Sequence, residues 1–365
     1  MPLNAFHGYR YTTISRKGLR RHTLPIARHQ WPRRNTGGAI DTLFGTIYYL
    51  SQVVQRMRAY AFRRILQFIP TILIISMIMF VLLNLLPGNA ALMAGDQRKA
   101  PDPRIVEQLK KEWGIDKPVH TRYFIYLKGL VRGDLGTSFL RREPVNKLVG
   151  ERIWPTLRLS IAALLISVGI GIPLGFISAL KRGTLVDTAS MIGAVSGVSL
   201  PQFWLGLLLM YLFSVVLGWL PSSGYGHGKF ANLIMPAITL GIGYTALLAR
   251  ATRAAVLEVL HKDYIRTARA KGLSELLVNW RHVMRNTMVL VLTTAGLQFG
   301  ALIGQTVIVE KLFSWPGLGS LLVDSIFQRD IPVTQGCILV MILVFLIVNL
   351  VVDLLYSVVD PRIEY

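Results

Sequence analysis

The chain has 365 residues, of which 52% are hydrophobic and 16% are charged, with a mean hydropathy of +0.48 and a formal net charge of +21. A soluble domain carries about a quarter charged residues, so this composition excludes an ordinary soluble protein and indicates a membrane protein. The single cysteine, Cys337, excludes an internal disulfide, and it lies in an apolar run where we expect it to be a small core residue.

Residues 1–56 differ from the rest of the chain. They are rich in Arg, His, Tyr and Thr and contain no long apolar run. Three interpretations stay open: a disordered basic tail, an arm that binds the membrane surface or a partner, or sequence translated upstream of the true start. We favour the first and the third. A membrane domain then extends over residues 57–365, beginning with the basic segment from Met57 to Arg64.

Six apolar runs follow, each near the 17–25 residues that cross a bilayer. They cover residues 65–86, 159–180, 189–217, 233–249, 287–309 and 333–352. The predicted fold class is therefore an all-α polytopic membrane protein with about six transmembrane helices. Glycines at four-residue spacing in the second, third and fifth runs predict close helix packing. Pro173, Pro201 and Pro236 predict kinks, with hinges or unwound backbone as the alternative.

The distribution of basic residues predicts the topology. Residues 1–64 hold twelve Lys and Arg against one acid, and residues 250–285 hold eight against three acids. The segment 219–232 between the third and fourth runs holds only Lys229. Because basic residues collect in cytoplasmic loops, we expect both termini and the 250–286 loop in the cytoplasm. This placement explains the net charge without nucleic acid.

Residues 87–155 appear to break this rule, with thirteen basic and eight acidic residues on the expected outer side. The segment is longer than the roughly 60 residues over which the charge bias acts. We therefore predict a small extracytoplasmic element there.

The sequence contains no catalytic or metal-binding motif, so we do not expect an enzyme and expect no cofactor in this chain. Within the apolar runs the larger polar residues are amides, among them Asn84, Gln298, Gln305 and Asn349. Ion-coupled transporters usually place charged residues in the membrane. The chain therefore lacks an obvious energy source of its own.

The loop after the fourth run begins with a segment that has the composition of a short basic helix ended by glycine. It consists of Asp263, Tyr264, Ile265, Arg266, Thr267, Ala268, Arg269, Ala270, Lys271 and Gly272. Tyr264, Ile265, Ala268 and Leu273 offer an apolar side that suits a groove on a soluble protein. The alternative is a loop that is basic only because it is cytoplasmic.

These residues carry a resemblance to a known family. The frame Arg266-Thr267-Ala268, three residues, Gly272, nine residues, His282-x-Met284-Arg285 is similar to the cytoplasmic loop of ABC importer permeases, although the family's Glu and Pro are replaced. Further matches in order across residues 57–365 include Leu86-Pro87-Gly88, the segments 133–138, 199–206, 233–237 and 310–319, and Val359-Asp360-Pro361. The chain is identified as resembling the dipeptide/oligopeptide/nickel branch, with a likeness to the first (B-type) of its two permeases.

The resemblance implies the type I importer permease fold and a multi-pass location in the bacterial cytoplasmic (inner) membrane. It implies four kinds of partner: a second homologous permease, two cytoplasmic ATPase subunits that hold ATP and Mg²⁺, an extracytoplasmic solute-binding protein, and membrane lipid. The helix from Asp263 to Gly272 becomes the ATPase-coupling helix. The implied function is import of di- and oligopeptides, with nickel or another small solute as the alternative substrate and a self-sufficient channel as the alternative class.

The resemblance also suggests an outer-mouth loop near the binding protein, formed by Trp315, Pro316, Gly317, Arg329 and Asp330. The alternative is a structural turn that closes the fifth and sixth spans, and we expect Arg329 and Asp330 to pair at the surface. The substrate-binding residues stay unassigned.

Overall fold

The computed structural model describes residues 39–85, 107 and 116–359. The chain divides into two units, residues 1–52 and 53–365, and all the predicted spans belong to the second unit. The tail expected over residues 1–56 lies outside the described residues up to 38. Its remainder, residues 39–56, belongs to helix α1 (Ala39–Leu85).

Among the described residues, five helical segments are long and apolar enough to cross a membrane, and they match the first, second, fourth, fifth and sixth predicted runs. Their bounds are Tyr60–Leu85 of α1, α5 (Val145–Leu180), α8 (Phe230–Leu260), Glu275–Leu312, and Ile331–Leu354 of α13 (Ile331–Val359). The fourth of these segments combines α10 (Glu275–Leu277), a π-helix (Val278–Met284) and α11 (Arg285–Leu312).

Two predicted boundaries differ from the structure. Helix α5 begins 14 residues before the predicted start at Leu159, inside the expected outer element. Helix α8 continues to Leu260, so the first part of the expected 250–286 loop is helical. Polar side chains at helix ends hide the last turns from a hydropathy pattern, because such a pattern reports the apolar length and not the helical length.

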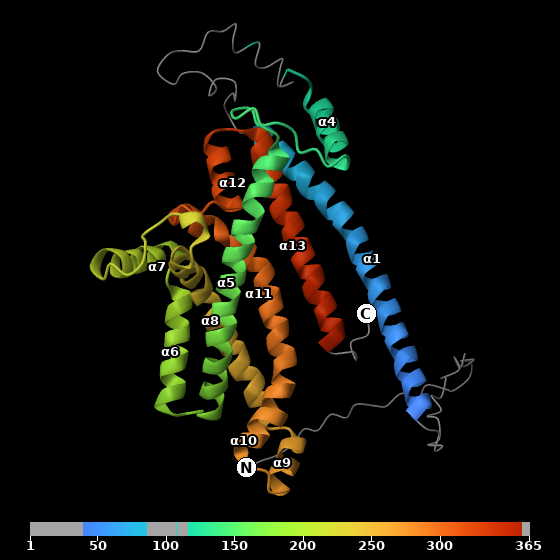
Figure 1. Cartoon of the computed structure of the whole chain (residues 1–365), viewed down its shortest axis with the longest axis vertical. Helices are drawn as coiled ribbons and strands as arrows, with labels where there is room; N and C mark the ends of the chain where they lie inside the picture. Colours follow the sequence, from blue (N-terminus) through green and yellow to red (C-terminus); the bar gives the residue numbers. More distant parts are fainter. Residues whose placement is uncertain (1–38, 86–106, 108–115, 360–365) are drawn as a thin grey trace, which may run out of the picture. The chain divides into compact units, whose positions relative to one another are not determined.

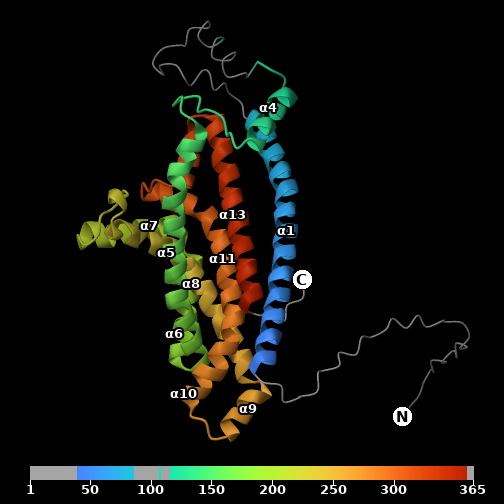
Figure 2. The same cartoon turned by 45° about the vertical axis from the view of Figure 1, so that its right-hand side comes forward.

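The third predicted span, 189–217, is broken. It forms α6 (Leu185–Ser199), α7 (Gln202–Leu209) and a π-helix (Met210–Val216), with a bend of 104° between α6 and the helical segment from Gln202 to Val216. Leu200 adopts extended backbone angles before Pro201, as a residue before proline prefers. In both views α7 projects sideways from α5 and α8 (Figures 1 and 2).

Helices α5 and α8 form the most extensive helix pair, and glycine allows their close contact. A Cβ atom at Gly171 would lie 2.9 Å from the Thr245 carbonyl oxygen, and one at Gly175 would lie even closer to the Ala249 carbonyl oxygen. The predicted glycine packing is thus present in the second span. It is absent at Gly193 in the third span, where a Cβ would meet no described atom within 4 Å.

A second core lies where α5 begins, against α12 (Leu318–Phe327) and α13. Its buried members are Val145, Leu148, Val149, Leu318, Leu321, Val333 and Cys337. Cys337 is fully buried in this cluster, as expected of a small core residue.

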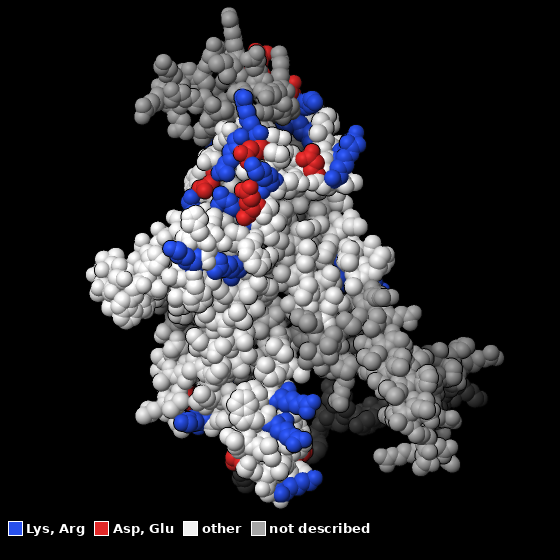
Figure 3. Space-filling view, viewed as in Figure 1, with Lys and Arg blue, Asp and Glu red and all other residues white. Residues whose placement is uncertain are grey.

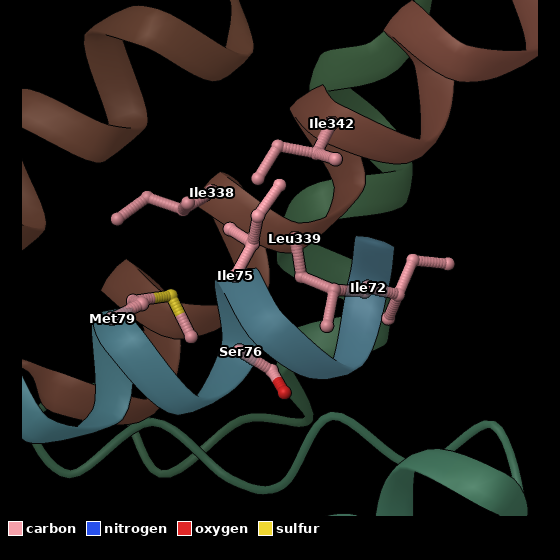
Figure 4. Close-up of a pocket in the computed structure, with 7 residues that line it drawn as sticks. All are labelled: Ile72, Ile75, Ser76, Met79, Ile338, Leu339 and Ile342. Atoms are coloured by element: carbon pink, nitrogen blue, oxygen red, sulfur yellow. The ribbon is translucent and has the colours of Figure 1, made fainter. Parts of the chain in front are cut away.

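Helix α1 contacts α13 at two levels. Arg64 forms an ion pair with Asp353 at 3.0 Å, and Tyr60 donates a hydrogen bond to the same carboxylate. Further along, an apolar cleft between the two helices is lined by Ile72, Ile75, Ser76, Met79, Ile338, Leu339 and Ile342 (Figure 4). The Ser76 hydroxyl lies 3.1 Å from that of Tyr123 in α4 (Val119–Val131). This cleft is a helix seam lined by hydrocarbon and offers a polar substrate little.

Charged side chains gather at two ends of the described structure, the α12 end and the α9 end. On the face shown in Figure 3, Lys, Arg, Asp and Glu cluster towards α12 and α4 and again towards α9 (Asp263–Ala270), with a largely uncharged band between. An uncharged band between charged ends is what a bilayer core requires.

Candidate functional site

The predicted basic helix is present as α9, and the sequence explains its limits. Asp263 provides an acid in the first turn, and Ala268 and Ala270 favour helix in the second. Gly272 comes two residues after the helix with φ of +78°, the left-handed conformation that ends helices and that glycine adopts without strain.

One face of α9 packs on the chain itself. Ile265 and Ala268 are buried in a cluster with Phe176 of α5, Val256 of α8 and Val283 of the π-helix. The expectation that these two residues would lie in a groove of another protein is therefore wrong. They anchor α9 to the ends of the spans, and only Tyr264 of the expected apolar side, with 43% of its surface exposed, faces outward.

The opposite face of α9 is exposed and basic. The Arg266 side chain is 75% exposed, and Lys271 is exposed as well. Arg269 makes two hydrogen bonds to the Glu275 carboxylate, at 2.8 and 3.2 Å. Just before the helix, Lys262 bonds to Glu258 at 2.9 Å, and this contact raises the pKa of Lys262. The sequence frame thus places Arg266 and Lys271 as cations that a partner can reach.

A buried ion pair at the α9 end was not found from the sequence. Asp187, in the first turn of α6, accepts two hydrogen bonds of 2.8 Å from Arg253 of α8. It also accepts hydrogen bonds from the Ser178 hydroxyl of α5 and the Gly183 amide. This carboxylate therefore ties α5, α6 and α8 together. The two partners are 66 residues apart, and the signal was the single acid in the connection between the second and third apolar runs.

Trp315, Pro316 and Gly317 form a tight turn between α11 and α12 that packs into the core. Trp315 is fully buried, and its indole N–H donates a 2.9 Å hydrogen bond to the Pro155 carbonyl oxygen in α5. Its ring packs edge-on against Tyr225, with centroids 4.8 Å apart. These contacts are those of a structural turn. A contact between this segment and a binding protein stays a prediction.

Glu310 belongs to the last turn of α11, and its carboxylate lies against Gly317 of this tight turn. It was not predicted as a site residue. Its fully buried carboxylate accepts hydrogen bonds from the Thr156 hydroxyl at 2.6 Å and the Ser320 amide at 3.0 Å. The Thr156 oxygen in turn accepts a bond from the Leu318 amide. A Cβ atom at Gly317 would overlap the carboxylate, so only glycine fits there.

Arg329 and Asp330 do not form the expected surface pair. Asp330 is 2% exposed and accepts hydrogen bonds from the Ser138 hydroxyl and the Phe139 amide. The carboxylate thus fixes the segment around residue 138 to the start of α13. Buried backbone N–H groups need an acceptor, and this requirement outweighs pairing with an adjacent exposed cation.

Comparison with known proteins identifies the family. A model of the binding-protein-dependent transport system inner membrane component matches residues 171–365, and a model of the N-terminal part of such membrane components matches residues 57–160. The chain belongs to this family. It is therefore a multi-pass permease subunit of a bacterial ABC importer in the inner membrane, a transport subunit and not an enzyme.

Relatives narrow the branch. The chain is 44% identical over 310 residues to the glutathione transport system permease protein GsiC of Escherichia coli strain CFT073, and the match covers 85% of this chain and 100% of the relative. The GsiC protein of strain K12 matches with the same identity and coverage, and that of Salmonella choleraesuis is 43% identical with the same coverage. This branch is the peptide/nickel family that the motifs indicated.

Solved structures confirm the fold. Two inward-facing crystal forms of the MetNI methionine ABC transporter match with TM-scores of 0.50 and 0.51, at 18% identity. Each comparison covers 58% of this chain and 96% of the transporter chain. In general terms, membership of the family implies a second permease, ATPase subunits and a binding protein.

Proposed function

We propose that this chain forms half of the translocation pathway of an ATP-driven importer for di- and oligopeptides. A distinct second permease forms the other half, and two cytoplasmic ATPase subunits bind ATP and Mg²⁺. In this proposal both termini and α9 lie in the cytoplasm, and the α12 end faces an extracytoplasmic binding protein. Its peptide substrate is supported by the relatives named for glutathione transport, because glutathione is itself a peptide.

The geometry of α9 carries the coupling part of the proposal. A coupling element has to transmit movement without slack, so it needs a firm attachment to the spans and a free face for the ATPase. Helix α9 has both: Ile265 and Ala268 are buried against α5 and α8, while Arg266 and Lys271 are exposed. Movement of α9 by an ATPase would then displace α5 and α8 directly.

Reversing the two exposed charges tests this role. We expect Arg266→Glu with Lys271→Glu to lower the ATPase that co-purifies with the permease more than about tenfold, because like charges facing each other at an interface cost several kcal/mol. Uptake of labelled peptides should fall with it. Arg269 is left unchanged because its reversal would break two hydrogen bonds to Glu275, whereas reversal of Arg266 removes only a 3.9 Å ion pair with the exposed Asp263.

The matched control makes the same change of charge at the other end. Lys128→Glu with Arg132→Glu alters two residues of α4 and its cap, and co-purification of the ATPase should not change. Normal ATPase recovery and uptake in the α9 variant would rule out the coupling role. A purified chain that conducts solute alone in a bilayer would show a channel instead, and uptake of nickel without peptides would redirect the substrate.

A further inference from the structure

A pair of amide side chains joins the bent third span to the fifth span. Gln202 is the first residue of α7, and its Nε2 donates a hydrogen bond of 3.0 Å to Oε1 of Gln305 in α11. Gln305 lies seven residues before the end of α11 at Leu312, which is about 10 Å along the helix. The pair therefore lies within the apolar band and away from both charged ends.

Two asparagines in the spans are satisfied differently, whereas Gln298 and Gln335 each have a buried amide atom without a hydrogen-bond partner among the described residues. Asn84 donates a 2.6 Å hydrogen bond to a carbonyl oxygen of its own helix, and Asn349 packs against Gly300 of the neighbouring helix. Gln305 is instead exposed in this chain and bonds to an amide from a different helix. Its environment therefore differs from that of an amide that serves helix packing.

The surface around Gln305 also differs from a lipid-facing surface. The exposed side chains of α1 between Ile65 and Leu85 are large and apolar, such as Ile69, Ile74 and Leu82. On α11 the exposed residues next to Gln305 are the small Ala301 and Gly304, and the large apolar Ile308 and Leu297 are exposed one and two turns away. Polar groups that face hydrocarbon are costly, so an exposed amide pair at this depth belongs on a surface that meets water, substrate or another helix.

We propose that the Gln202–Gln305 pair lines the translocation pathway and binds a peptide group of the passing substrate. The bond between them uses one Gln202 N–H and the Gln305 carbonyl oxygen, which leaves the Gln202 oxygen to accept from a peptide N–H and the Gln305 amide to donate to a peptide C=O. If Gln305 donated instead, the pair would still present one acceptor and one donor.

Recognition of this kind depends on the peptide backbone of the substrate and not on its side chains. It suits a carrier of peptides with varied residues, and it adds to the proposed function, on which it rests. A metal ion or an apolar solute would gain little from one neutral acceptor next to one neutral donor.

The test compares uptake of labelled Ala-Ala with uptake of the same dipeptide methylated on its peptide nitrogen, in cells that contain the complete transporter. Gln202→Met removes the acceptor for the N–H, so we expect uptake of Ala-Ala to fall about fivefold and uptake of the methylated peptide to stay nearly unchanged. The readout is the ratio of Ala-Ala uptake to methylated-peptide uptake, compared between the wild-type and variant strains. The binding protein is the same in both strains, so its own preference between the two peptides cancels.

Three further variants sharpen the result. Gln305→Leu removes the donor for the peptide C=O, so it should lower uptake of both peptides. Gln202→Glu keeps an acceptor of the same length and should keep the wild-type ratio. Leu297→Ala, an exposed change two turns away on α11, should alter neither rate.

The outcomes separate the two proposals. An unchanged ratio in Gln202→Met, with normal membrane levels and ATPase recovery, would overturn the pathway contact. The contact would also be overturned if the ratio of Ala-Ala uptake to methylated-peptide uptake fell as much in Gln202→Glu as in Gln202→Met. The effect would then come from packing and not from the lost acceptor. Absence of ATP-dependent uptake of either peptide by the wild-type transporter would instead count against the proposed substrate.

Discussion

Helix α9 and the turn between α11 and α12 attach to the helix bundle in opposite ways. At the α9 end a charged helix touches the spans through two apolar residues, Ile265 and Ala268, and its polar side chains face outward. At the α12 end the turn after α11 is buried, and its polar groups bond to one another around Glu310.

The difference shows that a permease can be rigid at one end and movable at the other. A buried network of satisfied polar groups fixes one geometry, because any displacement leaves donors unpaired in a poorly hydrated site. An apolar contact is less directional, so an element attached in this way can be bound and moved by a partner while it stays in contact with the spans. The turn between α11 and α12 is thus rigid, whereas α9 is an element that a partner can move.

Removal of the Glu310 carboxylate should have the largest effect on stability. Glu310→Ala leaves the Thr156 hydroxyl and the Ser320 amide without their acceptor and opens a void. Each buried unsatisfied group costs roughly 1–3 kcal/mol, so we expect a loss of about 3 kcal/mol or more in the free energy of unfolding. Thermal unfolding of the purified protein in detergent measures this loss.

The matched control is a glutamate at the other end. Glu258 pairs with Lys262 but is 67% exposed, so Glu258→Ala should cost less than about 1 kcal/mol. Equal shifts in unfolding temperature for the two variants would mean that Glu310 is no more important than a surface acid, and the contrast between the two ends would be lost.

The ion pair between Asp187 and Arg253 should give an intermediate effect. Arg253→Ala removes two hydrogen bonds to a buried carboxylate, and hydrogen bonds to charged groups contribute roughly 1.5–3 kcal/mol each. Arg253 is 26% exposed, so solvent screening places the expected loss near the lower value, about 1.5 kcal/mol.

A double-mutant cycle with Asp187→Ala isolates the pair. The double variant should lose less than the sum of the single variants by about 1 kcal/mol, whereas Glu143 and Lys147, an exposed pair one turn apart, should couple by about 0.3–0.5 kcal/mol. A coupling no larger than that of the exposed pair would show that the α9 end contains no firm polar attachment.

Much of the fold could be predicted because its signals are local. Apolar length locates five spans, and Ala268, Ala270 and Gly272 are sufficient to predict α9 and its end. The break at Pro201 was visible as a proline, but hydropathy cannot distinguish a straight span from a bent one. The predicted kink at Pro201 is therefore confirmed, whereas the size of the bend, 104°, was not predicted.

The buried polar contacts could not be predicted because they are not local. Thr156 and Glu310 lie 154 residues apart, and Ser138 and Asp330 lie 192 apart. A single sequence shows that each residue is polar but not which partner it meets. For the same reason Asp330 was assigned to its neighbour Arg329, whereas its real partners come from another part of the chain.

Gly272→Ala should have the smallest effect, and its direction tests whether α9 needs its defined end. At φ of +78° an alanine is strained by about 1 kcal/mol, although no described atom lies within 4 Å of its Cβ. The same substitution at Gly150, an exposed position inside α5 that is equally open, should stabilise the protein by roughly 0.5–1 kcal/mol, because glycine weakens a helix interior.

The two substitutions add the same methyl group in open space, so their unfolding temperatures should move in opposite directions. Because the strain falls at the junction of α9 with the segment that carries Glu275, Gly272→Ala should also lower ATP-dependent uptake more than Gly150→Ala does. A stabilising Gly272→Ala would mean that α9 can continue through this position. The length of α9 would then be set by its contacts with α5 and α8 and not by the glycine.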